Sequence, residues 1–168
     1  LLNNSGETES VMAEPGIVWT RIDNRLVHGQ VGNAWVGATG ANLVIVADDA
    51  AAQDKVQQQL MKMTAESAGC GIKFFTLDHT IDVFSRKTPK KSILLVVHNP
   101  ASARKLIEGG VPIKLVNVGN MHADGKKTVY HESHVYTDDK DLADFDAIKA
   151  AGIDLFIQIL PTDRKIEI

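Results

Sequence analysis

The stretch Ile17-Val-Trp-Thr-Arg-Ile-Asp-Asn-Arg-Leu-Val-His-Gly-Gln-Val31 joins an apolar run to a polar turn and then to the start of a helix. Residues 17–19 have the apolar character of a strand, and residues 30–38 place apolar side chains at helical spacing. We therefore expect His28 on a strand-to-helix turn. In an open α/β sheet such a turn lies at the carboxyl ends of the strands, where ligands bind and the N–H groups that open a helix attract anions.

The rest of the chain repeats this alternation of strand and helix. The sequence predicts further strands at 42–47, 72–77, 92–97, 114–118 and 154–160, and helices at 50–68, around 81–84, from 99 to 109 and at 138–151. This rhythm is typical of right-handed βαβ units. We expect a single-domain α/β fold with an open, mostly parallel twisted sheet and helices on both faces, and residues 128–136 at an antiparallel edge or in a hairpin.

The predicted helix 50–68 has natural N-cap residues before it and an apolar stripe along it. Asp48 and Asp49 are the expected caps. Val56, Leu60 and Met63 recur at spacings of four and three, which predicts that they pack into the core.

Composition excludes several classes of protein. The chain has 168 residues, of which 44% are hydrophobic, and a formal net charge of -3, so we expect one domain, at 15–168, and no nucleic-acid partner. A single cysteine, Cys70, allows no internal disulfide, and no apolar run approaches a membrane span. We expect a soluble, cytoplasmic protein, with residues 1–14 as a disordered extension, an interdomain linker or a remnant of cloning.

The polar turn has the residues that a phosphorylated histidine needs. His28 supplies a nucleophilic ring nitrogen near neutral pH, and Arg21 and Arg25 supply positive charge for a phosphoryl group. Arg25 lies in the loop itself and is the stronger candidate for a phosphoryl clamp. For Arg21, a solvated charge at the end of the strand is the alternative interpretation.

Three further residues complete this candidate site. Asp23 is placed to orient an arginine or to hold one tautomer of the imidazole through its other nitrogen. The backbone N–H groups of Gly29 and Gln30 are expected to form an oxyanion-type cradle at the helix start.

Other sites are less well supported by the sequence. Asn120 and His122 follow the strand predicted at 114–118, so they line a pocket beside the loop or belong to a Gly-Asn turn. His131 and His134 would point to opposite faces of a strand, which argues against a shared metal ion. Glycine-rich nucleotide-binding motifs are missing, and we expect neither a metal nor a cofactor.

The string from Arg21 to Val31 closely resembles the active-site loop of the IIB components of the mannose/fructose/sorbose family of the bacterial sugar phosphotransferase system. Similar segments at 41–47, 110–113, 117–122 and 158–162 extend the resemblance over residues 15–168, and the N-acetylgalactosamine-type members are the most similar.

The resemblance implies a phosphoryl carrier. His28, through Nδ1, would accept a phosphoryl group from a phosphorylated IIA domain or subunit and pass it to a hexose, ketose or amino sugar that enters through membrane IIC and IID subunits. The carrier would then associate peripherally with that membrane complex. Leu26 and Val27 are expected to contact partners or simply to pack the loop. A non-catalytic module that binds phosphate or a phosphosugar is the alternative function, and the sequence leaves open a homo-oligomer.

Overall fold

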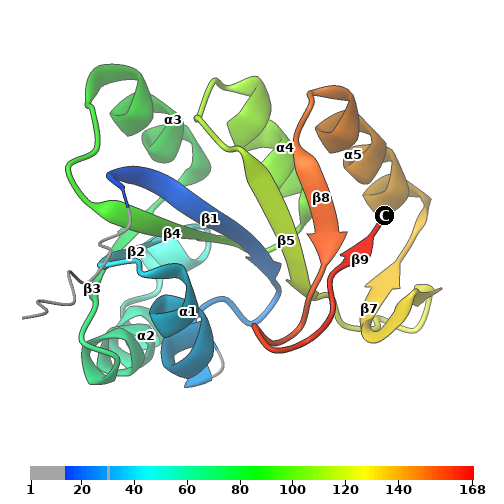
Figure 1. Ribbon diagram of the computed structural model, residues 1–168, viewed down its shortest axis with the longest axis horizontal. Coiled ribbons are helices and arrows are strands. Elements are labelled where there is room, and N and C mark those ends of the chain that lie inside the picture. The colour runs from blue at the N-terminus through cyan, green and yellow to red at the C-terminus, as the bar shows by residue number, and fades with distance from the viewer. Residues whose placement is uncertain (1–13, 30) are drawn as a thin grey trace, which may run out of the picture.

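The apolar runs of the sequence form a seven-stranded sheet with the order β3-β2-β4-β1-β5-β8-β9 (Figure 1). The computed structural model describes residues 14–29 and 31–168, so most of the predicted N-terminal extension and Gln30 lie outside the described residues. Neighbouring strands pair in parallel, except that β9 is antiparallel to β8. The strands of this sheet are β1 (Gly16–Asp23), β2 (Leu43–Ala47), β3 (Gly71–Phe75), β4 (Ser92–Val97), β5 (Leu115–Asn120), β8 (Asp154–Ile157) and β9 (Ile166–Glu167).

Helices cover both faces of the sheet, each over its own apolar core. α3, α4 and α5 pack on one face, and η1, α1 and α2 pack on the other (Figure 1). The helical elements are η1 (Val31–Trp35), α1 (Val36–Thr39), η2 (Ala51–Gln53), α2 (Lys55–Ser67), α3 (Leu77–Arg86), α4 (Pro100–Glu108) and α5 (Asp139–Ala150). The predicted α/β class, with a mostly parallel sheet and helices on both faces, is confirmed.

Strand β1 lies in the middle of the sheet, between β4 and β5. The helix that follows β1 covers one face, whereas α5, which comes after β5 in the chain, covers the other. The carboxyl ends of β1 and β5 therefore lie where the helices change from one face of the sheet to the other, and open α/β sheets bind ligands at such a point. The loop with His28 leaves β1 at this point.

Of the two structures predicted for residues 128–136, an antiparallel edge or a hairpin, the hairpin is the one observed. The alternating stretch 128–136 forms a separate antiparallel pair, β6 (Thr128–Tyr130) and β7 (Glu132–Thr137), next to β5. The antiparallel edge of the main sheet is β9 instead, which the sequence did not indicate because it has only two residues.

The helix after His28 buries a different set of side chains from the one that the sequence predicts. Residues 31–35 form a π-helix, and α1 continues from it. The apolar spacing in 30–38 puts Val31, Ala34, Trp35 and Ala38 on one side of the predicted helix. Trp35 is buried, but Ala38 is exposed, and Val36, which is not in this set, is buried. A π turn holds more residues than an α turn, so it rotates every later side chain around the helix axis.

The helix predicted at 50–68 begins five residues later. Asp48 accepts a hydrogen bond at 2.9 Å from the N–H of Ala51, the first residue of the 3-10 turn η2. The cap of α2 is Asp54, which accepts from the N–H of Gln57 at 3.0 Å. Asp49 accepts instead from the N–H of Leu77, the first residue of α3.

The apolar stripe of this helix does not face the core. Met61 and Ala65 are the buried residues of α2, whereas Val56, Leu60 and Met63 are exposed to solvent. The prediction that these three residues pack inward was therefore wrong. Helical periodicity identifies residues that share a face, but it cannot tell which face meets the sheet.

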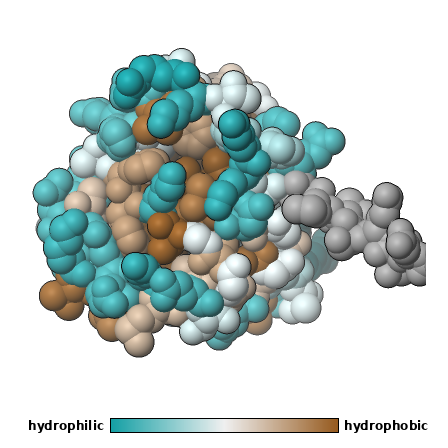
Figure 2. Space-filling model, turned by 90° about the vertical axis from the view of Figure 1, so that its left-hand side faces the viewer, coloured by the Kyte–Doolittle hydropathy of each residue, from teal (hydrophilic) through white to brown (hydrophobic). Residues whose placement is uncertain are grey.

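A second apolar surface lies at the β3 edge of the sheet, where hydrophilic residues surround a hollow with an apolar floor (Figure 2). The hollow has a volume of about 860 Å³ and is lined by Leu43, Phe75, Phe84 and Ile93, with Lys73 among the basic residues around it. Leu43 and Ile93 lie at the amino ends of β2 and β4, so the hollow extends away from the edge of the sheet that holds His28.

Candidate functional site

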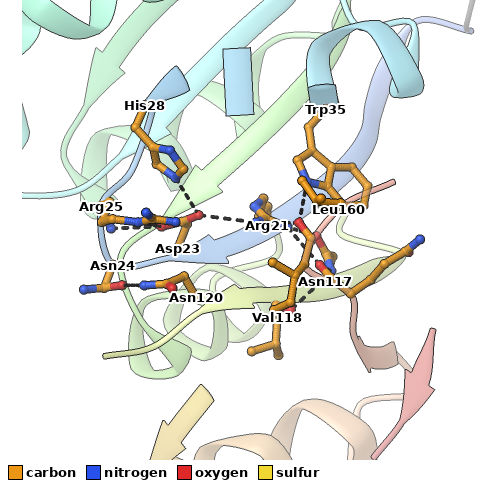
Figure 3. A network of polar contacts seen from close by, with 12 residues as sticks. Arg21, Asp23, Asn24, Arg25, His28, Trp35, Asn117, Val118, Asn120 and Leu160 are labelled. Atoms are coloured by element: carbon orange, nitrogen blue, oxygen red, sulfur yellow. Dashed lines mark hydrogen bonds and ion pairs between the residues drawn. The ribbon is translucent and has the colours of Figure 1, made fainter. Parts of the chain in front are cut away.

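The carboxylate of Asp23, the last residue of β1, is the centre of a network of polar contacts (Figure 3). Its Oδ2 lies 3.0 Å from Nε2 of His28 and 3.4 Å from Nη2 of Arg21. Its Oδ1 accepts the backbone N–H of Arg25 at 3.0 Å and lies 3.6 Å from the Nε of the same residue. The side chain of Asp23 has no exposed surface. One buried acid thus contacts the histidine and both arginines that the sequence singled out.

The loop after Asp23 is held by its own apolar residues. Leu26 has a φ of 56°, in the left-handed region that a leucine rarely adopts, and its N–H donates to the carbonyl of Asp23 at 2.9 Å. Leu26 and Val27 are 2% and 4% exposed and belong to the core beneath the helix. Of the two expected roles, partner contact or loop packing, their burial supports packing.

A second anchor joins the loop to the end of β5. The N–H of Asn24 donates to the carbonyl of Asn120 at 3.1 Å, and the two side-chain amides are hydrogen-bonded as well (Figure 3). β5 runs through Asn120, so the alternative of a Gly-Asn turn was wrong. His122, by contrast, is exposed, and it lines a cavity of about 340 Å³ that Asn24 also lines.

Arg21 lies inside the protein. Its Nη1 donates to Oδ1 of Asn117 at 2.7 Å and to the carbonyl of Gln158 at 3.1 Å, and its Nη2 donates to the carbonyl of Ile159 at 3.1 Å. Its guanidinium carbon also lies 5.0 Å from the centre of the Trp35 ring. The side chain has no exposed surface, so the alternative of a solvated charge was wrong. Arg21 contacts Asp23 rather than the open side of the imidazole.

Gly119 makes room for this guanidinium. A Cβ atom at position 119 would lie 2.0 Å from Cζ of Arg21 and 2.3 Å from its Nη2, far inside van der Waals contact. The strand β5 therefore passes Arg21 at a distance that only a glycine allows.

Burial and charge act in opposite directions on the two buried ionisable groups. Burial alone would raise the pKa of Asp23, but the hydrogen bond with His28 and the positive charge of Arg21 outweigh it, and the pKa lies below its ordinary value. Burial lowers the pKa of Arg21 to about 10, although the carboxylate of Asp23 opposes this change. Both groups are therefore ionised at neutral pH, and they form a fixed pair beneath the imidazole.

His28 and Arg25 are the members of the network that reach solvent. Their side chains are 21% and 49% exposed. The carbonyl of His28 accepts the N–H of Gly32 at 3.0 Å, so the helix begins at the histidine, and Gly29 is its first described helical residue. When Nε2–H of the neutral ring donates to Asp23, the lone pair lies on Nδ1. In that tautomer Nδ1 is the nucleophilic ring nitrogen, and the half-exposed guanidinium of Arg25 contacts the same carboxylate.

Sequence reasoning missed the residues that hold Arg21. Asn117 and Gly119 were noticed only within the segment 117–122, and Gln158 and Ile159 only within 158–162. Trp35 had no predicted role beyond that of an apolar residue in the helix after His28. The hydrogen bonds join residues 96 to 138 positions apart, and no local spacing indicates such contacts.

The described residues contain neither a metal-ligating cluster nor a membrane-spanning helix. In residues 14–29 and 31–168, three or more His, Cys, Asp or Glu side chains never gather in a way that could hold a metal ion. None of the helices described is long and apolar enough to cross a membrane.

Comparison with known proteins gives one consistent match. Residues 17–168 match the family model described as PTS system sorbose subfamily IIB component. The N-acetylgalactosamine-specific phosphotransferase enzyme IIB component 1 of Escherichia coli (strain K12) is 51% identical over 158 residues, which are 94% of this chain and 99% of that protein. The crystal structure of the Escherichia coli IIB component 1 superposes with a TM-score of 0.87 at 50% identity, covering 91% of this chain and 99% of that one.

A longer relative shows the same domain in another context. The mannose-specific EIIAB component of Escherichia coli (strain K12) is 34% identical over 150 residues, which are 88% of this chain but 45% of that protein. These matches confirm the family resemblance of the sequence. The chain belongs to the sorbose subfamily of IIB components of the sugar phosphotransferase system.

Proposed function

We propose that the protein is a phosphoryl carrier in which His28 accepts a phosphoryl group from a phosphohistidine of a IIA protein and transfers it to a sugar. IIB components work with IIA and with membrane IIC and IID partners. The observation that carries the proposal is the 3.0 Å contact between Nε2 of His28 and the buried carboxylate of Asp23, with the half-exposed Arg25 beside it.

Nδ1 of His28 is the proposed nucleophile. Its lone pair attacks the phosphorus of the donor phosphohistidine, whose ring carries a proton on its other nitrogen. The donor P–N bond breaks as the new bond forms, and the donor leaves as neutral imidazole with the electron pair of the broken bond. The phosphorylated ring keeps its Nε2–H and gains positive charge, which the Asp23 carboxylate 3.0 Å away stabilises. In the second transfer the oxygen of a sugar hydroxyl attacks the phosphorus as the P–Nδ1 bond breaks. Nδ1 takes back the electron pair of that bond, and the hydroxyl proton passes to solvent. Positioning and charge stabilisation supply most of such a catalytic effect.

Arg21 and Arg25 have different proposed tasks. Arg25 is half-exposed and is proposed to neutralise the phosphoryl oxygens on His28, together with the N–H of Gly29 at the helix start. Gln30, the other expected member of this cradle, lies outside the described residues. Arg21 is buried against Asp23, so it acts on His28 only through that carboxylate, as a positioning residue. By keeping Asp23 ionised, Arg21 keeps the imidazole of His28 in the tautomer whose lone pair lies on Nδ1.

The proposed sugar is an amino sugar of the N-acetylgalactosamine type, because the 51% identical relative is specific for N-acetylgalactosamine. The proposed location is the cytoplasm, with peripheral attachment to the membrane complex of IIC and IID.

Intact mass spectrometry tests the carrier function. The protein is incubated with phosphoenolpyruvate, the general phosphotransferase proteins and a IIA partner of the N-acetylgalactosamine type. We expect a gain of one phosphoryl group that is labile in acid and stable in alkali, and no gain in the His28→Ala variant. Reversible binding of phosphate or a phosphosugar without a covalent product would support the regulatory module and refute the carrier.

A further inference from the structure

The exposed apolar residues of the protein are concentrated on one helix. Among the described residues four large hydrophobic side chains are exposed, and three of them belong to α2. Val56 is 74% exposed, Leu60 62% and Met63 58%, and their spacing of four and three places them on one stripe, which we call the α2 stripe. Large hydrophobic side chains that share an exposed face mark interaction sites more often than single scattered ones do.

Helix α2, which carries the α2 stripe, packs against η1, the helical segment that follows His28. A Cβ atom at Gly32 would lie 2.7 Å from Cγ2 of Thr64 and 3.3 Å from its carbonyl oxygen, so the two helices touch closely at this pair. Both helices follow parallel strands and run in the same direction, side by side on one face of the sheet (Figure 1). Four residues before Gly32 is His28, and four residues before Thr64 is Leu60. Leu60 therefore lies on α2 at about the height of His28 along the helix axis. Val56 lies one turn closer to the N-terminus of α2.

The exposure of His28 limits how a phosphoryl donor can approach. The ring is 21% exposed, and its Nε2 side faces the buried Asp23, so a donor must reach it from the outer surface. A protein that brings its own phosphohistidine into contact with His28 covers the neighbouring surface, which includes the α2 stripe. A small apolar centre with a charged rim, here the half-exposed Arg25, suits an interface that forms and dissociates in every transfer cycle.

We infer that the α2 stripe docks the phosphoryl donor, a protein whose phosphohistidine is bordered by a complementary apolar surface. This inference rests on the proposed function, because it names the surface by which the partner of His28 is recognised. The stripe contributes binding energy and leaves the chemistry at the imidazole unchanged.

The Leu60→Glu variant tests the inference, because a docking residue should affect KM for the donor protein and not kcat. Glutamate keeps the helix but places a charge in the centre of the stripe. With phosphorylated IIA protein as the varied substrate, we expect KM for phosphorylation of His28 to rise about 10-fold or more, while kcat changes little. Phosphoramidate, a small phosphoryl donor that needs no docking surface, should label the variant at the wild-type rate. A Leu60→Gln variant, which adds no charge, should show a smaller rise in KM.

Val129→Glu is the matched control, because Val129 is also a half-exposed hydrophobic residue, at 55%, but lies on the β6–β7 hairpin beside β5, away from α2 (Figure 1). We expect its KM to equal that of the wild type. An equal KM for wild type and Leu60→Glu overturns the inference, as does an equal rise in Val129→Glu. Light scattering tests the other occupant. If the wild type is a homodimer, and Leu60→Glu makes it a monomer without changing the kinetics with the donor, the α2 stripe binds a second copy of this chain instead. Loss of labelling with both donors in the wild type refutes the carrier function itself and not the docking surface.

Discussion

Replacing Gly119 by alanine would insert one methyl group between β5 and the guanidinium of Arg21. Such a substitution usually stabilises a protein by about 0.4–1 kcal/mol where the backbone is compatible, because the unfolded chain loses freedom. Gly119 has no positive φ, so its backbone accepts alanine. The sign of the effect therefore depends on whether Arg21 can move away.

The contacts of Arg21 leave it little room. The new Cβ would lie 2.0 Å from Cζ, so the guanidinium or the strand must shift by at least about 1 Å to reach even a tight contact of 3.0 Å. Hydrogen bonds to Asn117, Gln158 and Ile159 hold the guanidinium in place. Overpacking costs about 1–3 kcal/mol, and each buried polar group left without a partner costs about 1–3 kcal/mol more. We expect a net destabilisation of about 3 kcal/mol.

Urea and thermal unfolding measure this loss, and labelling kinetics measure its effect on the site. We expect the Tm to fall by about 10 °C and His28 to be phosphorylated more slowly in the folded variant, because Asp23 loses its buried counter-ion. Gly37→Ala is the control, since a Cβ at Gly37 meets nothing within 4 Å and the residue lies in α1, so this variant should gain up to about 1 kcal/mol. A Gly119→Ala protein as stable and as active as the wild type would refute the claim that β5 fixes the position of Arg21.

Three further substitutions test the individual members of the network. His28→Ala should abolish phosphorylation and leave the free energy of unfolding within about 1 kcal/mol of wild type, checked by mass spectrometry and urea titration, since the ring is partly exposed. Arg25→Lys should slow single-turnover transfer from phosphorylated IIA, because a point charge replaces a planar fork; an unchanged rate would remove Arg25 from the clamp. Asp23→Asn should lower the free energy of unfolding at pH 7 by about 3 kcal/mol, because it leaves Arg21 buried without its counter-ion. The pKa of Asp23 is lowered in the folded protein, so the stability that its carboxylate contributes is present above the unfolded pKa of about 3.9 and is lost as the pH falls through the folded value. The difference in unfolding free energy between wild type and Asp23→Asn should therefore narrow below about pH 4, and a constant difference down to pH 2 would contradict the assignment.

Much of the fold could be predicted because its signals are local. Continuous apolar runs such as Leu43–Ala47 identify buried parallel strands, and Asn99 followed by Pro100 identifies the start of α4. The position of His28 after β1 follows from the same reasoning. The side of a helix that meets the sheet is a tertiary property, so the orientation of α2 could not be predicted, and the π turn after His28 leaves no mark in the spacing of apolar residues.

In the candidate site, too, local contacts could be predicted from the sequence and long-range contacts could not. Asp23 lies five residues from His28, and their contact is a property of one turn, which the sequence could indicate. Arg21 contacts residues from β5 and from the segment after β8, and its burial depends on a glycine 98 positions away. Two arginines four positions apart in the same loop motif thus have opposite environments, one enclosed and one in solvent, and only the assembled sheet distinguishes them.

The buried side chain of Leu26, in its left-handed backbone conformation, ties the active loop to the core. A loop held in this way cannot open without exposing apolar core surface, so it belongs to the same cooperative unit as the strands beneath it. The amide hydrogens of Asn24, Leu26 and Gly32, all of them hydrogen-bonded, should then exchange with deuterium only through global unfolding. The domain would present the same surface before and after each transfer, and successive partners would differ in their affinity for the phosphoryl group itself rather than for an altered carrier.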